Sequence, residues 1–351
     1  MNAMFRDLFK IGSGSISAML TLRVAAAVGV PLLGFLVAGR PLAAVVAAAS
    51  AMFATLSDIG TSVSERAGTM LATTAVLLAG GWVGTHFGGT AYTNEAVVLI
   101  AALIAGWVSG SHPGIATVAR FAAVAAVAGT AMRASGVGMV AAAAVLAGGI
   151  WALVMAVAAR QLTRAPVDIN HMDWRAGVRR ALGGADAGPR YALCYAGAAS
   201  LSLLFADELG VTNAYWATLT TILVMRREGM ASLTLVLHYM AGTLIGIPIA
   251  YVLFHGIQQP VAIALLATAA SAGARVGLAL NPALGFAAFT VFFMLIIDLA
   301  LGHSGAPQHL LSVRLYDVTV GCALALLGTL AAAVGARRAP ATLGTKSPSA
   351  D

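Results

Sequence analysis

The sequence predicts an all-α membrane protein with about twelve transmembrane helices, arranged as two parallel six-helix repeats. Three observations lead to this fold class. The composition is strongly apolar, the apolar runs have the length of a bilayer span, and motifs of the first half recur in the second half. In lipid, an α-helix satisfies its backbone hydrogen bonds within its own segment, so apolar runs of this length are predicted as helices.

The composition excludes a soluble domain. Apolar residues make up 60% of the chain and charged residues only 9%, with a mean hydropathy of +0.90, whereas soluble domains carry about 25% charged residues. Too few charges remain to cover a surface in water, so the predicted surroundings are a lipid bilayer. The net charge of +7 does not indicate nucleic acid, because the arginines stand at the ends of apolar runs, where they set membrane topology.

A spanning helix needs about 20 apolar residues. In the first half, the predicted spans are 20–39, 41–57, 67–87, 95–111, 114–133 and 136–159. In the second half, they are 190–207, 211–225, 231–254, 258–275, 282–301 and 312–336. The predicted division is therefore a cytoplasmic N-terminal segment, a first membrane repeat, a cytoplasmic linker, a second membrane repeat and a disordered cytoplasmic tail, at 1–19, 20–159, 160–189, 190–336 and 337–351.

The distribution of arginine and lysine predicts the orientation. With an even number of spans, both termini lie on one side, and most basic residues fall on that side. The opposite side holds only Arg40, Arg133 and Arg314. Loops rich in arginine and lysine stay in the cytoplasm. The prediction is a multi-pass protein of the inner (plasma) membrane with both termini in the cytoplasm.

An internal repeat supports two equivalent halves. The tripeptide at 58–60 precedes that at 227–229 by 227 − 58 = 169 residues, and His112-Pro113 precedes Asn281-Pro282 by the same 281 − 112 = 169 residues. Because each half has an even number of spans, both halves enter the membrane in the same direction. They are predicted to be related by a pseudo-two-fold axis along the membrane normal.

Residues 215–229, YWATLTTILVMRREG, and 238–250, HYMAGTLIGIPIA, carry a family resemblance. This pattern resembles the fusaric acid resistance family of integral membrane proteins, which are aromatic acid exporter-like. The resemblance implies two six-helix units, with the soluble domain of larger members replaced here by the linker. Plant aluminium-activated malate transporters are similar at a distance, as dimers of one such unit. The resemblance therefore implies organic anions as cargo and leaves a homo-oligomer open.

Arg120 is the first candidate for a substrate site. It lies about two turns into the predicted span 114–133, where an ionisable group costs about 2.5–3.5 kcal/mol at the helix centre. In one interpretation it faces a cavity between the halves and binds an anion. In the other, its long side chain reaches back to the membrane boundary.

Four further arginines are candidates for an electropositive entrance from the cytoplasm, which would gather anions. They are Arg23, Arg190, Arg226 and Arg227. The alternative is that they only anchor the topology. The acidic Asp58 and Glu65 occupy the matching turn of the first half and are expected to reach across to Arg226 or Arg227.

A third group stands near the predicted outer end of the second half. Arg314 and Asp317 are three residues apart on one helical face and can pair, and Asp298 can join them. The group is interpreted as an ion-pair cluster that closes the outer mouth. The alternative is a carboxylate that couples transport to protons.

The seven histidines and two cysteines show no metal-ligand spacing, and the sequence has no phosphate-binding loop of the G-x-x-x-x-G-K-[ST] kind. We therefore expect no metal, no cofactor, no enzymatic activity and no nucleic-acid partner. The predicted function is a transporter, exporting small organic anions of the aromatic carboxylate class through a cavity between the repeats. The alternative is a membrane assembly or envelope-maintenance protein that transports nothing.

Overall fold

The computed structural model describes residues 18–60, 62–110, 112–132, 138–163, 178–179, 188–209, 215–301 and 307–336. Within these ranges the elements are twelve helices and no strand. The first half contains α2 (Ala18–Val37), α3 (Pro41–Leu56), α4 (Val63–Phe87), α5 (Ala91–Val108), α6 (Pro113–Met132) and α7 (Gly138–Thr163). The second half contains α9 (Gly188–Glu208), α10 (Tyr215–Val224), α11 (Gly229–Gly256), α12 (Pro260–Leu280), α13 (Pro282–Leu301) and α14 (Pro307–Ala336).

Each helix coincides with one of the spans predicted from the sequence, so the all-helical prediction is confirmed. The largest differences are five residues: α14 begins at Pro307 instead of 312, and α12 ends at Leu280 instead of 275. The predicted tail 337–351 lies outside the described residues, as do most of the predicted N-terminal segment 1–19 and most of the linker 160–189.

Local capping explains where several helices begin. The hydroxyl of Ser62 accepts a hydrogen bond from the backbone N–H of Glu65 at 3.1 Å. Thr90 and Thr93 form a reciprocal capping box at the start of α5. Both arrangements satisfy backbone donors that have no partner within the helix. Pro41 opens α3 and Pro260 opens α12, where the missing N–H of proline costs nothing.

Nine of the described helices are long and apolar enough to cross a bilayer by length and composition. The remaining three are α3 and α10, which are shorter apolar helices, and α9. The α10 helix has ten residues and measures only about 15 Å, half of a bilayer's hydrocarbon core. The described part of the chain is therefore a multi-pass membrane protein in which a short α10 lies among full-length helices.

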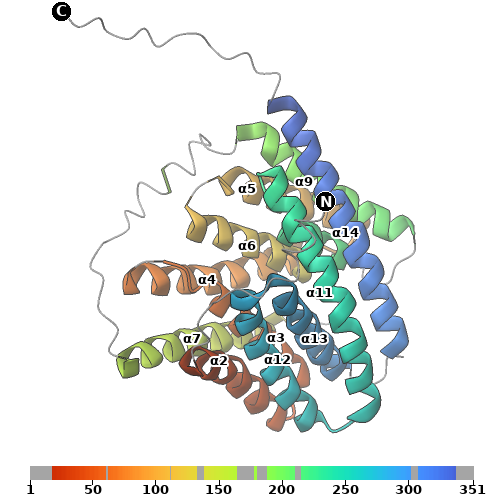
Figure 1. Cartoon of the computed structure of the whole chain (residues 1–351). Coiled ribbons are helices and arrows are strands. Elements are labelled where there is room, and N and C mark those ends of the chain that lie inside the picture. Colours follow the sequence, from red (N-terminus) through yellow and green to blue (C-terminus); the bar gives the residue numbers. More distant parts are fainter. Residues whose placement is uncertain are drawn as a thin grey trace, which may run out of the picture.

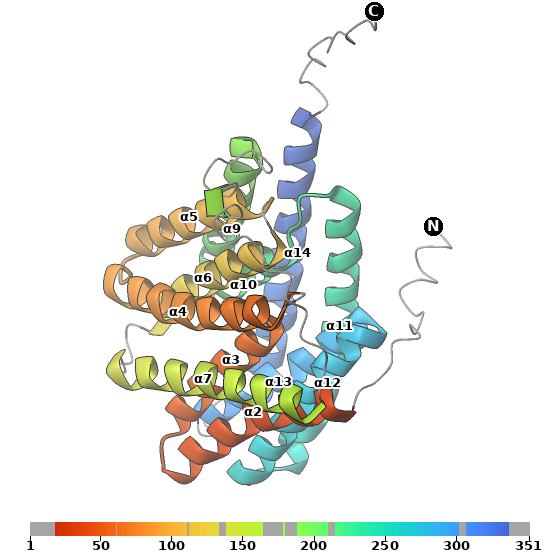
Figure 2. The same ribbon diagram turned by 90° about the vertical axis from the view of Figure 1, so that its left-hand side faces the viewer.

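The buried core lies where the two halves meet. Phe53 of α3 packs on Phe121 of α6, with ring centroids 4.8 Å apart, and on Phe293 of α13, at 6.0 Å. Between the halves, α5 packs on α9, α12 on α2, α6 on α10 and α13 on α3. In both views α4, α5, α6 and α7 run crosswise to α11 and α14 (Figures 1 and 2). One apolar cluster thus joins two differently inclined groups of helices.

Glycines bring pairs of helices into backbone contact. A Cβ atom on Gly84 of α4 would overlap with the carbonyl oxygen of Ala126 in α6. In the second half, a Cβ on Gly246 of α11 would lie 2.6 Å from the carbonyl oxygen of Ala287 in α13. In lipid, small residues at helix contacts permit this close approach and supply much of the association energy.

This packing makes a prediction for Gly84→Ala. The added methyl group meets the α6 backbone, which cannot rotate away as a side chain can, so we expect a loss of about 1–3 kcal/mol of stability from overpacking. Gly81→Ala on the same helix is the matched control, because a Cβ there has nothing within 4 Å. In detergent, the thermal unfolding midpoint of Gly84→Ala should be lower than that of the wild type, whereas the midpoint of Gly81→Ala should equal it. Equal midpoints for the two variants would contradict the close α4–α6 contact.

Candidate functional site

Asp58, which follows α3, lies at the centre of a cluster of arginines. Arg66 of α4 donates from Nε to Oδ1 at 2.5 Å and from Nη2 to Oδ2 at 2.6 Å. Arg23 of α2 approaches Oδ2 at 2.6 Å. The Asp58 side chain is only 2% exposed and that of Arg23 only 9%. A bidentate pair of this kind is a strong, directional charge-assisted interaction.

Burial alone would raise the pKa of the Asp58 carboxyl. The hydrogen bond from Arg66 and the positive charges of Arg23 and Arg66 outweigh burial and hold the pKa below its ordinary value. Asp58 is therefore a carboxylate at neutral pH. The expectation that Asp58 reaches across to Arg226 or Arg227 is wrong, because its partners come from α2 and α4 of its own half.

Glu65 also finds its partner within the first half. Its carboxylate lies 3.3 Å from Nε2 of His112, just before α6. Nδ1 of the same ring accepts the backbone N–H of Gly114 at 3.2 Å. The ring therefore ties the starts of α4 and α6 together, and it can do so as a neutral imidazole that carries its proton on Nε2.

A second group of charged and polar side chains lies at the contact of α5 and α6 with α9 and α10. Arg120 of α6 and Arg226, which follows α10, are within electrostatic reach of each other and of Tyr191 and Tyr195 on α9. The two tyrosines are 4% and 1% exposed, with ring centroids 5.8 Å apart. We refer to Arg120, Arg226, Tyr191 and Tyr195 as the arginine–tyrosine seam.

The seam concentrates positive charge without a matching carboxylate. Within the described residues, the ion pairs formed by arginines are those of Arg23 and Arg66 with Asp58, and neither Arg120 nor Arg226 takes part in one. Nε of Arg120 is buried without a hydrogen-bond partner. Burying like charges without a counter-ion is unfavourable, so this arrangement is suited to receive an anion.

Hydrogen bonds hold the seam in shape. The hydroxyl of Tyr195 donates to the carbonyl of Ile222 at 2.6 Å, which fixes α9 against α10. Nη1 of Arg226 donates to the carbonyls of Leu223 and Met225 at 2.8 and 3.0 Å. Burial and the positive charge of Arg120 lower the pKa of Arg226 to about 9, so Arg226 is still a cation at neutral pH.

The other two predicted entrance arginines are placed differently. Arg227 is exposed in the turn before α11. Arg190 is also exposed, and its Nη2 donates to the carbonyl of Ala331 on α14 at 3.2 Å. Of the five predicted substrate arginines, the structure therefore brings together Arg120 and Arg226, while Arg23 pairs with Asp58.

The third predicted group lies inside the second half. Arg314 of α14 donates to the hydroxyl of Tyr239 on α11 at 2.9 Å and lies 5.5 Å from the ring centroid of Trp216 on α10. Asp317 is fully buried, and neither of its carboxylate oxygens has a hydrogen-bond partner in the part of the chain that the structure describes. The described ion pairs do not include Arg314 with Asp317. Asp298 is buried on α13.

Removing the hydroxyl of Tyr239 should therefore destabilise the protein. In Tyr239→Phe the buried guanidinium of Arg314 loses its acceptor, and a hydrogen bond to a charged group contributes about 1.5–3 kcal/mol. Tyr251→Phe on the same helix is the control, because Tyr251 is 40% exposed and exposed substitutions change stability by about 0.5 kcal/mol or less. Chemical denaturation of both variants in detergent measures the difference. A Tyr239→Phe variant as stable as the wild type would show that the hydrogen bond between Arg314 and Tyr239 does not stabilise the fold.

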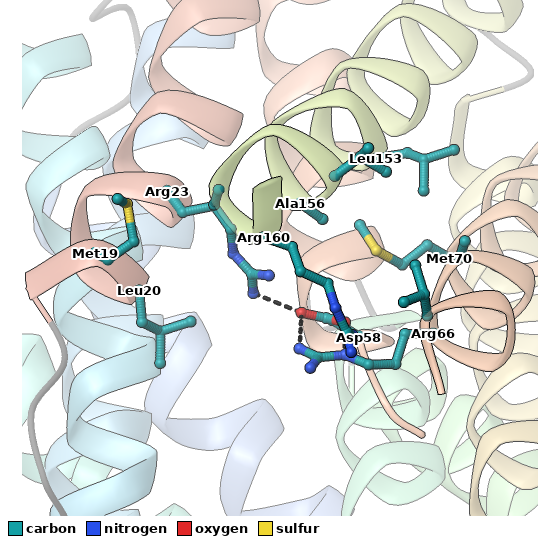
Figure 3. A pocket seen from close by; sticks show the side chains of 13 residues that line it. Met19, Leu20, Arg23, Asp58, Arg66, Met70, Leu153, Ala156 and Arg160 are labelled. Atoms are coloured by element: carbon teal, nitrogen blue, oxygen red, sulfur yellow. Dashed lines mark hydrogen bonds and ion pairs between the residues drawn. The ribbon is translucent and has the colours of Figure 1, made fainter. Parts of the chain in front are cut away.

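Two cavities differ in chemistry. One of 240 Å³ is lined by Arg23, Asp58, Arg66 and Arg160 together with apolar side chains of α2, α4 and α7 (Figure 3). Another of about 1000 Å³ lies among α3, α4, α6 and α7, and the described residues that line it include no arginine and no carboxylate. Of these two cavities, only the smaller is lined by charged side chains that could hold an anion, and neither is lined by the arginine–tyrosine seam. Among the described residues, no group of three histidine, cysteine or acidic side chains could hold a metal ion.

Apolar helices of spanning length and buried charged groups between them define a multi-pass α-helical membrane protein. The comparison with known families is more specific. The family model described as fusaric acid resistance protein-like matches residues 199–328, from α9 to α14. This match supports the assignment of the chain to that family, which the resemblance of residues 215–250 predicted. No curated protein and no solved structure matches the chain.

Sequence reasoning missed the two tyrosines of the seam. Tyr191 and Tyr195 stand four residues apart, so they occupy one face of α9, and Tyr191 directly follows the candidate Arg190. This spacing was an available signal. Their proximity to Arg120 was not, because Arg120 precedes Tyr191 by 191 − 120 = 71 residues and no local pattern joins them.

Proposed function

We propose that this protein transports small organic anions across the inner membrane, outward from the cytoplasm, and that the arginine–tyrosine seam binds them. The observation that carries the proposal is the pair Arg120 and Arg226, half-buried within electrostatic reach of each other and without an ion pair among the described residues. A guanidinium group binds a carboxylate through two parallel hydrogen bonds. The seam therefore offers positive charge to a negatively charged carboxylate substrate.

The tyrosines favour carboxylates that carry an aromatic ring. Tyr191 and Tyr195 present buried rings at a tilt of 42° beside the arginines, and aromatic rings pair favourably in tilted and offset arrangements. A benzoate-like anion would place its carboxylate between the guanidinium groups and its ring against the tyrosines. This substrate class agrees with the aromatic acids that the family resemblance implies.

We further propose that the chain consists of two parallel six-helix repeats, with the seam between them. Corresponding helices have corresponding neighbours: α4 packs on α6 as α11 packs on α13, α3 on α7 as α10 on α14, and α5 on α9 as α12 on α2. Asn281 accepts the N–H of Ala283 at 2.8 Å, as His112 accepts that of Gly114. Because the helices of the halves are inclined to each other (Figure 2), the repeat axis would lie between the two directions.

The repeats would then carry different charges at equivalent places. The contact of α2 and α3 with α12 and α13 holds Asp58, which neutralises Arg23 and Arg66. The equivalent contact of α9 and α10 with α5 and α6 holds Arg120 and Arg226, which form no ion pair with any described residue. One contact is thus neutralised by the protein itself, and the other would be neutralised by the substrate.

The membrane potential supports the proposed outward direction of transport. When the interior of the cell is negative, the membrane potential favours outward movement of a monovalent anion by a free energy of about 2.3 kcal/mol per 100 mV. Passive efflux therefore needs no nucleotide and no catalytic step. The excess of arginine and lysine on one side supports a cytoplasmic position for both termini and the linker.

Flux measurements on the purified full chain in liposomes test the function. Vesicles loaded with labelled benzoate should release it faster with the protein than without it, and faster when the interior is made negative. Zwitterionic amino acids of similar size should leave at the background rate. Absence of benzoate flux at either polarity would overturn the proposal and favour a membrane assembly protein that transports nothing.

A further inference from the structure

The pocket formed by α2, α4 and α7 has a charged rim above an apolar wall. Figure 3 shows the side chains of Arg23, Arg66 and Arg160 converging on Asp58 from three different helices. Met70 of α4 and Leu153 of α7 line the same cavity of 240 Å³. A ligand that fits this pocket has a negatively charged head and an apolar portion.

The rim carries more positive than negative charge. Among the described residues that line the pocket, three arginines surround one carboxylate, that of Asp58. Arg275 of α12 adds a further positive charge within electrostatic reach of Arg23, Arg66 and Asp58. The Arg23 side chain is nine-tenths buried, and its Nε has no hydrogen-bond partner among the described residues. This donor can be satisfied by an acceptor from an anion in the pocket.

The rim lies at one end of its helices. Arg23 and Arg66 stand in the first two turns of α2 and α4, and Arg160 stands in the last turn of α7. The ends of spanning helices lie at the depth of the lipid headgroups, and basic pockets between such ends on the cytoplasmic side bind anionic headgroups.

The pocket opens sideways along α7. Val157 lines the cavity and is also 38% exposed. Leu146, Ile150 and Val154 are also exposed on this helix. Together with Val157 they follow one another at intervals of four, four and three residues, so they form one continuous stripe along α7. In a bilayer this stripe contacts acyl chains, so a lipid can reach the pocket laterally while its chain remains in the hydrocarbon region.

We propose that the pocket between α2, α4 and α7 is a binding site for the phosphate headgroup of an anionic phospholipid. Arg23, Arg66 and Arg160 hold the phosphate, and Asp58 keeps two of these arginines in place. One acyl chain lies along Met70, Leu153 and Val157. The site is separate from the arginine–tyrosine seam, and it stands whether or not the seam transports anions.

Lipid binding to the delipidated full chain in detergent tests the site. Native mass spectrometry should show retention of phosphatidylglycerol, which carries an anionic phosphodiester, and loss of zwitterionic phosphatidylcholine at the same concentration. Phosphatidylglycerol should also raise the thermal unfolding midpoint, because a ligand that binds only the folded state stabilises it. Equal retention of the two lipids by the wild type would overturn the proposal.

Variants locate the binding. Arg160→Gln should weaken the retention of phosphatidylglycerol about tenfold, since one charge-assisted contact is lost. Arg227→Gln removes the same charge from an exposed turn and should bind as the wild type does. Equal losses in both variants would indicate a general charge effect and contradict a defined pocket.

Two soluble probes separate a lipid headgroup from a free anion. Inorganic phosphate and benzoate are each added without lipid, and the thermal unfolding midpoints of the wild type and of Arg160→Gln are compared. The difference between the two midpoints should be the same with either probe as in buffer alone. A stabilisation by phosphate that Arg160→Gln abolishes, with no effect of phosphatidylglycerol on the wild type, would assign the pocket to a soluble anion and overturn the lipid proposal.

Discussion

Replacing Arg120 by glutamine should reduce benzoate flux in liposomes by about 10- to 100-fold. The variant loses charge-assisted hydrogen bonds to the substrate carboxylate, which contribute about 1.5–3 kcal/mol, and each 1.4 kcal/mol is about a factor of ten in affinity. The loss should be greatest at low benzoate concentration, because the affected quantity is substrate binding. Initial rates over a range of benzoate concentrations measure it.

The fold of the variant should survive. Arg120 and Arg226 repel each other in the wild type, and glutamine removes this repulsion while remaining polar. The thermal unfolding midpoint of Arg120→Gln is therefore expected at or above that of the wild type. Benzoate should raise the midpoint of the wild type and leave that of the variant unchanged. This result would separate a loss of binding from a loss of structure.

A double variant tests whether both arginines hold the same anion. If Arg120 and Arg226 share one carboxylate, their effects are not additive, and Arg120→Gln with Arg226→Gln should lose little more flux than either single variant. Arg40→Gln, in an exposed position before α3, controls for net charge and should keep the wild-type flux. Wild-type flux in Arg120→Gln would exclude the seam from the transport path.

Replacing Asp58 by asparagine should have the largest effect on stability, a loss of about 3–5 kcal/mol, as expected for removing one partner of a buried ion pair. The nine-tenths buried Arg23 and the half-buried Arg66 then lose their common counter-ion at once, since Asp58 contacts both. Asp207→Asn is the control, because Asp207 is exposed at the end of α9 and its substitution should change stability by about 0.5 kcal/mol or less.

The same pair predicts a dependence on pH. The pKa of Asp58 is lower in the folded protein than its ordinary value of 3.8. Its contribution to stability is therefore complete above pH 3.8 and is lost as the pH falls through the folded-state pKa. The stability advantage of the wild type over Asp58→Asn should shrink in acid and stay constant from pH 5 to 7. An advantage that is unchanged in acid would contradict the ion pair.

Several features could be predicted from the sequence because they are properties of contiguous residues. Apolar runs of spanning length placed the helices, and the residues 215–250 indicated the family that the match at 199–328 supports. Arg120 could be singled out because an arginine inside an apolar run is costly wherever the run packs. Each of these conclusions needs only distances along the chain.

Partners across helices could not be predicted in the same way. Asp58 was expected to reach Arg226 or Arg227, yet the fold pairs it with Arg23 and Arg66. Arg314 was expected to pair with Asp317, three residues away on its own helix, yet it donates to Tyr239. In each case the observed partner depends on how neighbouring helices are rotated and packed.

The sequence by itself therefore determined that this is an all-helical membrane protein, where its helices lie along the chain and which family it resembles. The tertiary structure decided which charges meet. Asp58 neutralises Arg23 and Arg66, whereas Arg120 and Arg226 lie near Tyr191 and Tyr195 and pair with no carboxylate among the described residues. The physical reason is that a membrane helix is apolar around most of its circumference. Its sequence fixes its length but designates no face, and only the packing of small residues between helices sets the rotation that brings distant side chains together.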